Sequence, residues 1–155
     1  MITAIDIIFD GKSSIVDLHS LLEALLVKFR DVYFNEPEDV EFTTHEDIIN
    51  VFKSEVHIDF VVSLNELNMF GIAIPDVFAN LGVYNGEIEL LLFFDFKDLD
   101  FSDYKASIDH LRIWTTEFQN KFKFEYVRCQ IDNGNEDEYY FDSHGIGPCY
   151  NFLDK

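Results

Sequence analysis

The stretch EIELLLFFDF, residues 87–96, constrains the fold more than any other part of this sequence. It begins by alternating glutamate with apolar residues, as a strand with one solvated face does, and an unbroken apolar run then follows Glu89. Such a run is typical of a strand at the centre of a sheet whose faces are covered by helices. The sequence therefore predicts helices packed on a sheet.

Other segments carry weaker strand patterns. Residues 56–64, VHIDFVVSL, mostly alternate apolar with polar residues, which predicts a strand with one buried and one partly solvated face. Pro75 is expected to end a strand at residues 69–74 and to start a short helical turn that reaches Gly82. The remaining predicted strands are residues 3–9, a short segment at 41–43, and the two arms of a closing hairpin, 124–131 and 138–142.

Apolar residues at helical spacing mark two long helices, over residues 14–29 and from about residue 102 to 122. Thr44 is the predicted N-cap of a shorter helix between them. Strands and helices that follow one another in this way favour an α+β fold. We predict a single domain over residues 1–155, in which two principal helices pack on a mixed, mostly antiparallel sheet.

The charge of this chain is far larger than solubility requires. Asp and Glu number 30 against 11 Lys and Arg, giving a formal net charge of −19, whereas a magnitude of about 2–8 is enough for a small domain. Nucleic acid and anionic membranes are poor partners, because like charges repel. A basic protein is the favoured partner, since the field raises its association rate by about 10–10³-fold at low salt. An acidic proteome is the alternative explanation.

No motif in the sequence prescribes a reaction. His57 and Asp59 are the best candidate pair for a metal site, because period-two spacing places them on one strand face. A small hydrolase or metal-dependent enzyme centred on this pair is an alternative function, although a solvated strand face explains the pattern more simply. Cys129 and Cys149 form neither a CxxC pair nor a zinc spacing, so we expect both to be reduced. We predict no catalytic residue, cofactor or metal.

The start of the chain, MITAIDIIFDGK, lacks the basic region of a signal peptide. No uncharged run approaches the roughly 20 residues that a membrane helix needs. We therefore expect a cytoplasmic protein.

Two acidic segments are the predicted binding sites. The first lies between residues 36 and 47, where carboxylates gather and the apolar pattern fails. The second is the closing hairpin, where Tyr140 is expected to share a strand face with Glu138 and Asp142. Tyrosine among carboxylates suits a protein interface, because it supplies apolar area and a hydroxyl group; a final strand with an exposed tyrosine is the alternative. The candidate contact residues are Glu36, Glu38, Asp39, Glu41, Glu46, Asp47, Glu136, Asp137, Glu138, Tyr140 and Asp142.

The whole profile, a short, acidic, aromatic-rich α+β chain that closes on EYYFDSHGIGPCYN, resembles the immunity proteins of bacterial toxin systems, including contact-dependent inhibition and polymorphic toxins. The resemblance implies a protein that binds its cognate toxin and covers the active site. In nuclease toxins that site is basic, because the substrate is a polyanion. The implied partner is a cognate toxin domain with a basic surface. An acidic regulatory binding module is the other alternative, and the sequence sets no oligomeric state.

Overall fold

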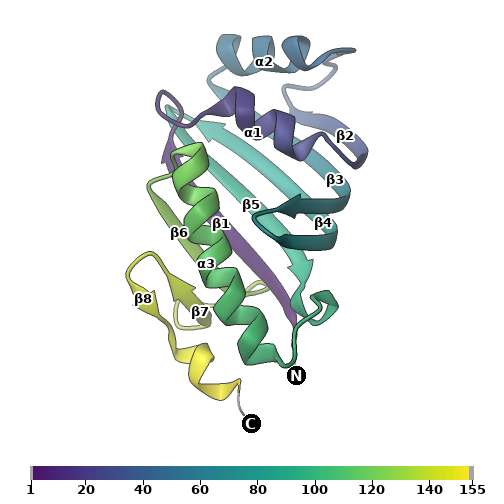
Figure 1. Ribbon diagram of the computed structural model, residues 1–155. Coiled ribbons are helices and arrows are strands. Elements are labelled where there is room, and N and C mark those ends of the chain that lie inside the picture. The colour runs from purple at the N-terminus through teal and green to yellow at the C-terminus, as the bar shows by residue number, and fades with distance from the viewer. Residues whose placement is uncertain (1, 154–155) are drawn as a thin grey trace.

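An eight-stranded sheet forms the framework of the protein (Figure 1). The computed structural model describes residues 2–153, and all statements of structure below refer to them. The elements in chain order are β1 (Ala4–Lys12), α1 (Leu18–Leu25), β2 (Phe29–Glu36), α2 (His45–Ser54), β3 (His57–Met69), β4 (Ile72–Tyr84), β5 (Glu87–Asp95), the 3-10 helix η1 (Phe96–Asp98), α3 (Tyr104–Phe122), β6 (Tyr126–Ile131), β7 (Tyr139–Asp142), β8 (Gly145–Ile146) and the 3-10 helix η2 (Pro148–Phe152).

The strands lie in the order β2-β3-β4-β5-β1-β6-β7-β8. Every pairing between the described strands is antiparallel, so the expected α+β fold with a mostly antiparallel sheet is confirmed, without the parallel pair of a mixed sheet. The first strand, β1, inserts between β5 and β6, and its whole length pairs with β5 from Ala4↔Asp95 to Lys12↔Glu87. Segments from both halves of the sequence are thereby joined in the middle of one sheet.

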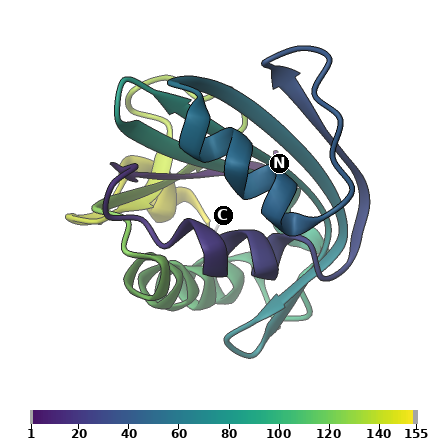
Figure 2. The ribbon, with the colours of Figure 1, turned by 90° about the horizontal axis from the view of Figure 1, so that it is seen from above.

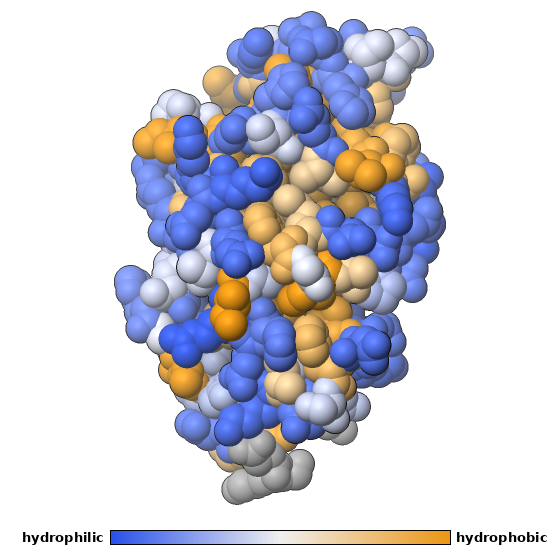
Figure 3. Space-filling view, in the orientation of Figure 1, coloured by the Kyte–Doolittle hydropathy of each residue, from blue (hydrophilic) through white to orange (hydrophobic). Residues whose placement is uncertain are grey.

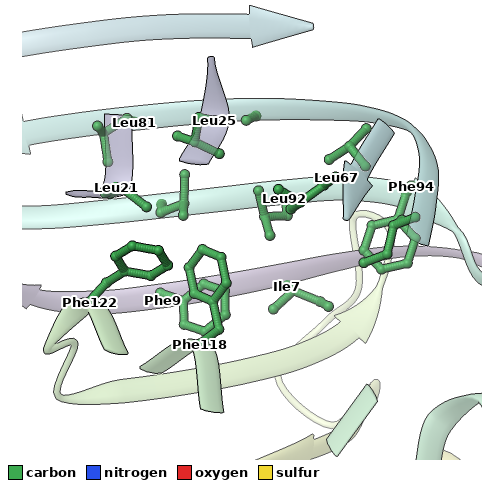
Figure 4. Packing of buried hydrophobic residues seen from close by; sticks show 14 of the residues in the cluster. Ile7, Phe9, Leu21, Leu25, Leu67, Leu81, Leu92, Phe94, Phe118 and Phe122 are labelled. Atoms are coloured by element: carbon green, nitrogen blue, oxygen red, sulfur yellow. The ribbon is translucent and has the colours of Figure 1, made fainter. Parts of the chain in front are cut away.

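All three α-helices lie on the same side of the sheet, which curves around them (Figure 2). Strand side chains alternate accordingly: Ile5, Ile7 and Phe9 of β1 are fully buried beneath the helices. The helices contribute Leu21 and Leu25 from α1 and large aromatic residues from α3, which meet the strand residues in one hydrophobic cluster (Figure 4). The expectation that helices cover both faces of the strand at residues 87–96 is wrong, because the opposite face carries no helix.

The first helix is shorter than its apolar spacing suggested. It is capped by Asp17, whose carboxylate accepts a hydrogen bond from the Ser20 amide at 3.3 Å, and its last residue is Leu25. Phe29, which was predicted to continue the helical stripe, instead starts β2 and pairs with Leu64. Tertiary pairing overrides local periodicity here, because aromatic and β-branched residues in FRDVYF also suit a strand.

The helical turn predicted after Pro75 is also wrong, because β4 continues from Ile72 to Tyr84. A proline fits this strand for a positional reason. β5 pairs with β4 only from Phe78 onward, so Pro75 lies where one edge of β4 is free and a missing N–H breaks no ladder bond. The short strand expected at residues 41–43 does not form, whereas the Thr44 cap of α2 and the closing hairpin are as predicted.

Candidate functional site: the acidic open face of the sheet

The face of the sheet opposite the helices is here called the open face. Its side chains are those that alternate with the buried residues of β1 to β6, and the strand register places them in rows. One row crosses four strands: Asp59 lies opposite Gly82, Gly82 opposite Glu89, and Glu89 opposite Asp10. Three carboxylates and a glycine therefore form a continuous line across the middle of the sheet.

Gly82 leaves a hollow in this row because it has no side chain. The hollow has a volume of about 560 Å³. Its lining residues are Asp10, Asp59, Asn80, Gly82, Tyr84, Glu87, Ile88 and Glu89. A shallow, carboxylate-lined depression of this kind can receive a positively charged side chain from a partner.

Two amides hold the carboxylate of Asp59 in place. Asn35 donates a hydrogen bond from Nδ2 to Oδ2 of Asp59 at 3.1 Å, and the Asn80 amide donates to the other carboxylate oxygen. Neither donor is charged, so the carboxylate is oriented without being neutralised. In the described residues no Lys or Arg forms an ion pair with Asp59.

Asp10 and Glu89 repel each other across the β1–β5 pair. Burial raises the pKa of Glu89, and the charge of Asp10 raises it further. Burial likewise raises the pKa of Asp10; a side-chain hydrogen bond with Glu89 offsets part of this rise, and the charge of Glu87 adds to it. An acid whose pKa is raised by folding favours the folded state below its unfolded pKa, and this contribution is lost as the pH rises through the folded value. Both groups therefore cost stability at neutral pH.

An apolar patch lies next to the carboxylate row. Leu91 pairs with Ile8 on one side, and Phe93 pairs with Phe78 on the other. Phe78 is 38% exposed although it lies in the middle of a strand. A second hollow of about 280 Å³ opens over these side chains and is bordered by Asp6 and by the turn after β6. The open face thus combines apolar area with a negative rim.

The helix side has a different character. Figure 3 shows it in the orientation of Figure 1, with an apolar strip between α1, α3 and the β3–β4 hairpin and hydrophilic side chains around it. A hollow of about 380 Å³ on this side is bordered by both Lys28 and Lys121 as well as by Glu23 and Glu66. Charges of both signs are therefore mixed on the helix side.

The first predicted segment lies beside the edge strand β2. Glu36, Glu38, Asp39, Glu41 and Glu46 are in this segment, and most of their side chains are exposed. Asp47 differs from them, because its carboxylate accepts hydrogen bonds from the amides of Thr43 and Thr44 at 2.9 and 3.1 Å, and these lower its pKa. Together with the Thr44 side chain it forms a capping box that starts α2. Asp47 thus stabilises the start of the helix.

The second predicted segment lies at the opposite edge. Tyr140 is 2% exposed, so the prediction that it is an exposed tyrosine among carboxylates is wrong. Its ring packs edge-on against Phe96 at 5.8 Å, and burial raises the pKa of its hydroxyl to about 12. Tyr139 is the partly exposed neighbour, with the Arg128 guanidinium 4.4 Å from its ring centre. Replacing Tyr140 would open the core rather than remove a surface contact.

The acids of this second segment line the turn and strand around Arg128. Its guanidinium donates to the carbonyl oxygens of Asn135 and Glu136 at 3.2 and 2.7 Å. Glu136 and Asp137 are exposed, and Glu138 accepts a hydrogen bond from the Asn135 amide at 3.0 Å.

Asp142, the last acid of the second segment, lies on the open face, opposite Arg128 of β6. It accepts a hydrogen bond from the Tyr126 hydroxyl at 3.1 Å, and its other carboxylate oxygen accepts one from the His144 amide at 2.8 Å. The predicted segments therefore lie at opposite edges of the sheet, and the open face connects them.

The glycines of the closing HGIGP sequence have a structural explanation. A Cβ atom at Gly147 would collide with the ring and the carbonyl oxygen of Tyr139. Gly147→Ala is expected to lower the free energy of unfolding by about 1–3 kcal/mol, because the overpacked segment must shift. Gly82→Ala is the control, since its added Cβ meets only ordinary contacts at 3.7 Å. Urea denaturation compares the two, and equal stability of the Gly147 variant and the parent would contradict this explanation.

His57 and Asp59 share the open face but do not form a common site. The His57 ring lies 5.3 Å from that of Tyr84, and its Nε2 is 3.4 Å from Oδ1 of Asn85. His144 lies instead 5.8 Å from Tyr126, ring centre to ring centre. Within residues 2–153 no group of His, Cys, Asp and Glu has the geometry to hold a metal ion.

The two cysteines, as expected, are unpaired in the structure. Cys129 is fully buried, and burial raises the pKa of its thiol. Burial also raises the pKa of the less buried Cys149. Raised thiol pKa values leave little thiolate at neutral pH, so neither cysteine has the character of a nucleophile.

Sequence reasoning missed most acids of the open face, among them Asp6, Asp10, Glu87 and Glu89 of the two central strands β1 and β5. The signal was present, because each alternates with an apolar residue in its strand: Asp6 and Asp10 in IDIIFD, and both glutamates in EIEL. The sequence does not indicate that β1 pairs with β5, and it is this pairing that brings the two pairs of acids together.

Fold and surface define a small acidic α+β protein with an uncovered, charged sheet face. The family model of the PABL017 Cdi1I immunity protein matches residues 4–143, so the chain belongs to this family of immunity proteins. Its members are binding proteins and not enzymes, which removes the hydrolase alternative. A search of the curated proteins finds no significant match.

A solved structure has the same fold. It is the crystal structure of the toxic C-terminal tip of CdiA from Pseudomonas aeruginosa in complex with immune protein, and a chain in it matches with a TM-score of 0.71 and 19% sequence identity. The match covers 96% of this chain and 99% of that chain. None of the helices in residues 2–153 is long and apolar enough to cross a membrane.

Proposed function

We propose that this protein neutralises a cognate CdiA-type C-terminal toxin domain in the cytoplasm by binding it and covering its active site. Membership in the Cdi1I immunity family over residues 4–143 carries this proposal. The solved structure of the same fold adds support, because it is a complex of an immune protein with the toxic tip of CdiA.

The charge of the chain points to a toxin with a basic surface. A net charge of −19 attracts a basic partner over distances longer than a contact. Toxins that cleave nucleic acid need a basic active site, because their substrate is a polyanion. We therefore favour a nuclease-type toxin, whose substrate-binding cations would lie opposite the carboxylates of this protein.

Growth rescue tests the proposal directly. Expression of the cognate CdiA-type toxin domain, to be sought in the neighbouring gene, is expected to stop growth, and co-expression of this protein is expected to restore it. The purified pair should form a complex in which the toxin's activity is lost. A toxin that stays active and unbound in the presence of this protein would contradict the proposed function.

Neutralising the acids near β2 tests their part in the interface. The variant carries Glu36→Gln, Glu38→Gln, Asp39→Asn and Glu41→Gln, while Asp47 is kept because it caps α2. We expect association to slow by roughly 5–10-fold at low salt. Electrostatic steering as a whole raises association rates by about 10–10³-fold, and these acids supply only part of it. Stopped-flow binding measures this rate, and an unchanged rate would remove these acids from the interface.

A further inference from the structure

We propose that the toxin docks on the open face of the sheet, with Phe78, Leu91 and Phe93 as its apolar centre and the hollow at Gly82 receiving a Lys or Arg side chain. This inference rests on the proposed function, because it locates the surface that the toxin covers. It shifts the centre of the interface from the two predicted segments to the sheet face between them.

The apolar patch is the first reason. A solvated face of an antiparallel sheet normally carries polar side chains. Here Leu91 and Phe93 sit side by side with Ile8 and Phe78 on a face that no helix covers. A compact apolar patch surrounded by charge is typical of the centre of a protein interface, where water is excluded on binding.

The second reason is the sign of the surrounding charge. The carboxylates that the strand register places across the open face are Asp6, Asp10, Asp31, Asp59, Asp76, Glu87, Glu89, Asp95 and Asp142. The cations that the same strands contribute are already engaged. Lys12 pairs with Glu87, Arg30 pairs with Asp76, and Arg128 donates to the carbonyl oxygens of the turn after β6. The net field of this face therefore selects a basic occupant.

The geometry of the hollow suits a single cationic side chain. Asp59 and Glu89 flank Gly82 on the neighbouring strands, about 10 Å apart along the hydrogen-bonding direction. A guanidinium or ammonium group between them can donate to both carboxylates. It would also relieve the repulsion between Asp10 and Glu89, so the arrangement that costs the free protein stability becomes favourable in the complex.

Charge also decides between the possible occupants. A second copy of this chain would bring two acidic faces together, which like-charge repulsion opposes. The apolar strip on the helix side is a rival surface for the toxin, but its hollow is bordered by Lys28 and Lys121 as well as by Glu23 and Glu66, so it lacks the excess of negative charge that would attract a basic partner. The open face is therefore the surface that a basic toxin domain fits.

The test compares open-face variants with matched helix-side controls, using the full chain and a catalytically inactive form of the cognate toxin domain from the rescue experiment. Phe78→Ser removes apolar area from the open face, and Ile113→Ser does the same on α3, where Ile113 is 64% exposed. We expect Phe78→Ser to weaken binding about 30-fold, mainly through faster dissociation, and Ile113→Ser to leave the affinity unchanged.

The hollow is tested separately by narrowing it and by neutralising it. Gly82→Ala adds one methyl group to the floor of the hollow without changing any charge, and is expected to weaken binding several-fold while the protein stays folded. The Asp10→Asn/Glu89→Gln pair is expected to slow association several-fold and to raise the melting temperature by about 1–4 °C, because opposed like charges are removed. Asp100→Asn/Glu117→Gln, in the loop before α3 and on α3, is the charge-matched control.

The outcomes separate this inference from the proposed function. If the parent protein fails to bind the toxin domain, the proposed function itself is contradicted. If the parent binds while folded Phe78→Ser and Gly82→Ala variants bind equally well, the open face is not the docking surface. Loss of binding in Ile113→Ser would assign docking to the helix side. A parent protein that is a dimer, and that the open-face variants convert to a monomer, would make a second copy the occupant and overturn the inference.

Discussion

Phe118→Ala is expected to lower the free energy of unfolding by about 3–5 kcal/mol, the range for truncating a buried phenylalanine. Phe118 is fully buried where α3 meets the sheet. Its ring centre lies 4.6 Å from that of Phe9 on β1, 4.6 Å from Phe122 and 5.1 Å from Trp114. Because the change leaves a cavity among several large rings that cannot all collapse into it, the lost contacts are not recovered.

Chemical denaturation followed by circular dichroism measures this loss. Ile113→Ala on the exposed side of the same helix is the control, and we expect it to change the free energy of unfolding by less than about 0.5 kcal/mol. A Phe118 variant as stable as this control would show that α3 does not depend on the aromatic cluster for its position.

The sequence predicts the helical layer well because amphipathic spacing is a local property. The α3 pattern places its buried aromatic residues on one stripe, and Asp103 caps it one residue after the predicted start at Ser102. The Thr44 cap of α2 is equally local, since it needs only Asp47 three residues later. The caps of α2 and α3 are thus predicted correctly, whereas the predicted helix over residues 14–29 shrinks to Leu18–Leu25 because Phe29 pairs in the sheet.

Features that depend on distant pairing were missed. The strand β2 was not foreseen, because Phe29 fits a helical stripe as well as a strand and only its pairing with β3 decides between them. Tyr140 was placed on the exposed face by strict alternation, but the register of β6 and β7 shifts at this point, because Cys129 pairs with Phe141 and Gln130 with Tyr139. Tyr140 is the extra residue of this irregularity, and it is buried together with the adjacent Phe141.

The candidate site shows the same division. Composition does not depend on the fold, so the acidity of the chain was evident before its strands were placed. The three carboxylates of the row, Asp10, Asp59 and Glu89, come from β1, β3 and β5, which are far apart in the chain and are brought together only through the sheet order. Asp10 and Glu89 place two acids opposite each other, which disfavours the folded state. Residue choices that cost stability in this way are expected at functional surfaces.

Raising the salt concentration is expected to slow association with the toxin domain by about 10–10³-fold, the full range of electrostatic steering. The reason is screening: the Debye length falls from about 30 Å at 0.01 M salt to about 3 Å at 1 M. Dissociation should change little, because it depends on the apolar contacts made at short range. Stopped-flow association at increasing salt measures the first rate, and dilution of the preformed complex measures the second.

The same salt series should act in the opposite direction on the free protein. The excess of negative side chains, a net charge of −19, makes them repel one another in the folded protein. Salt screens this repulsion, so it is expected to raise the free energy of unfolding while it slows binding. A partner held mainly by apolar contacts would instead associate at the same rate throughout the series, and that result would exclude steering by a basic toxin surface. Opposite responses of stability and association rate would show that one charge distribution destabilises the free protein and attracts its partner.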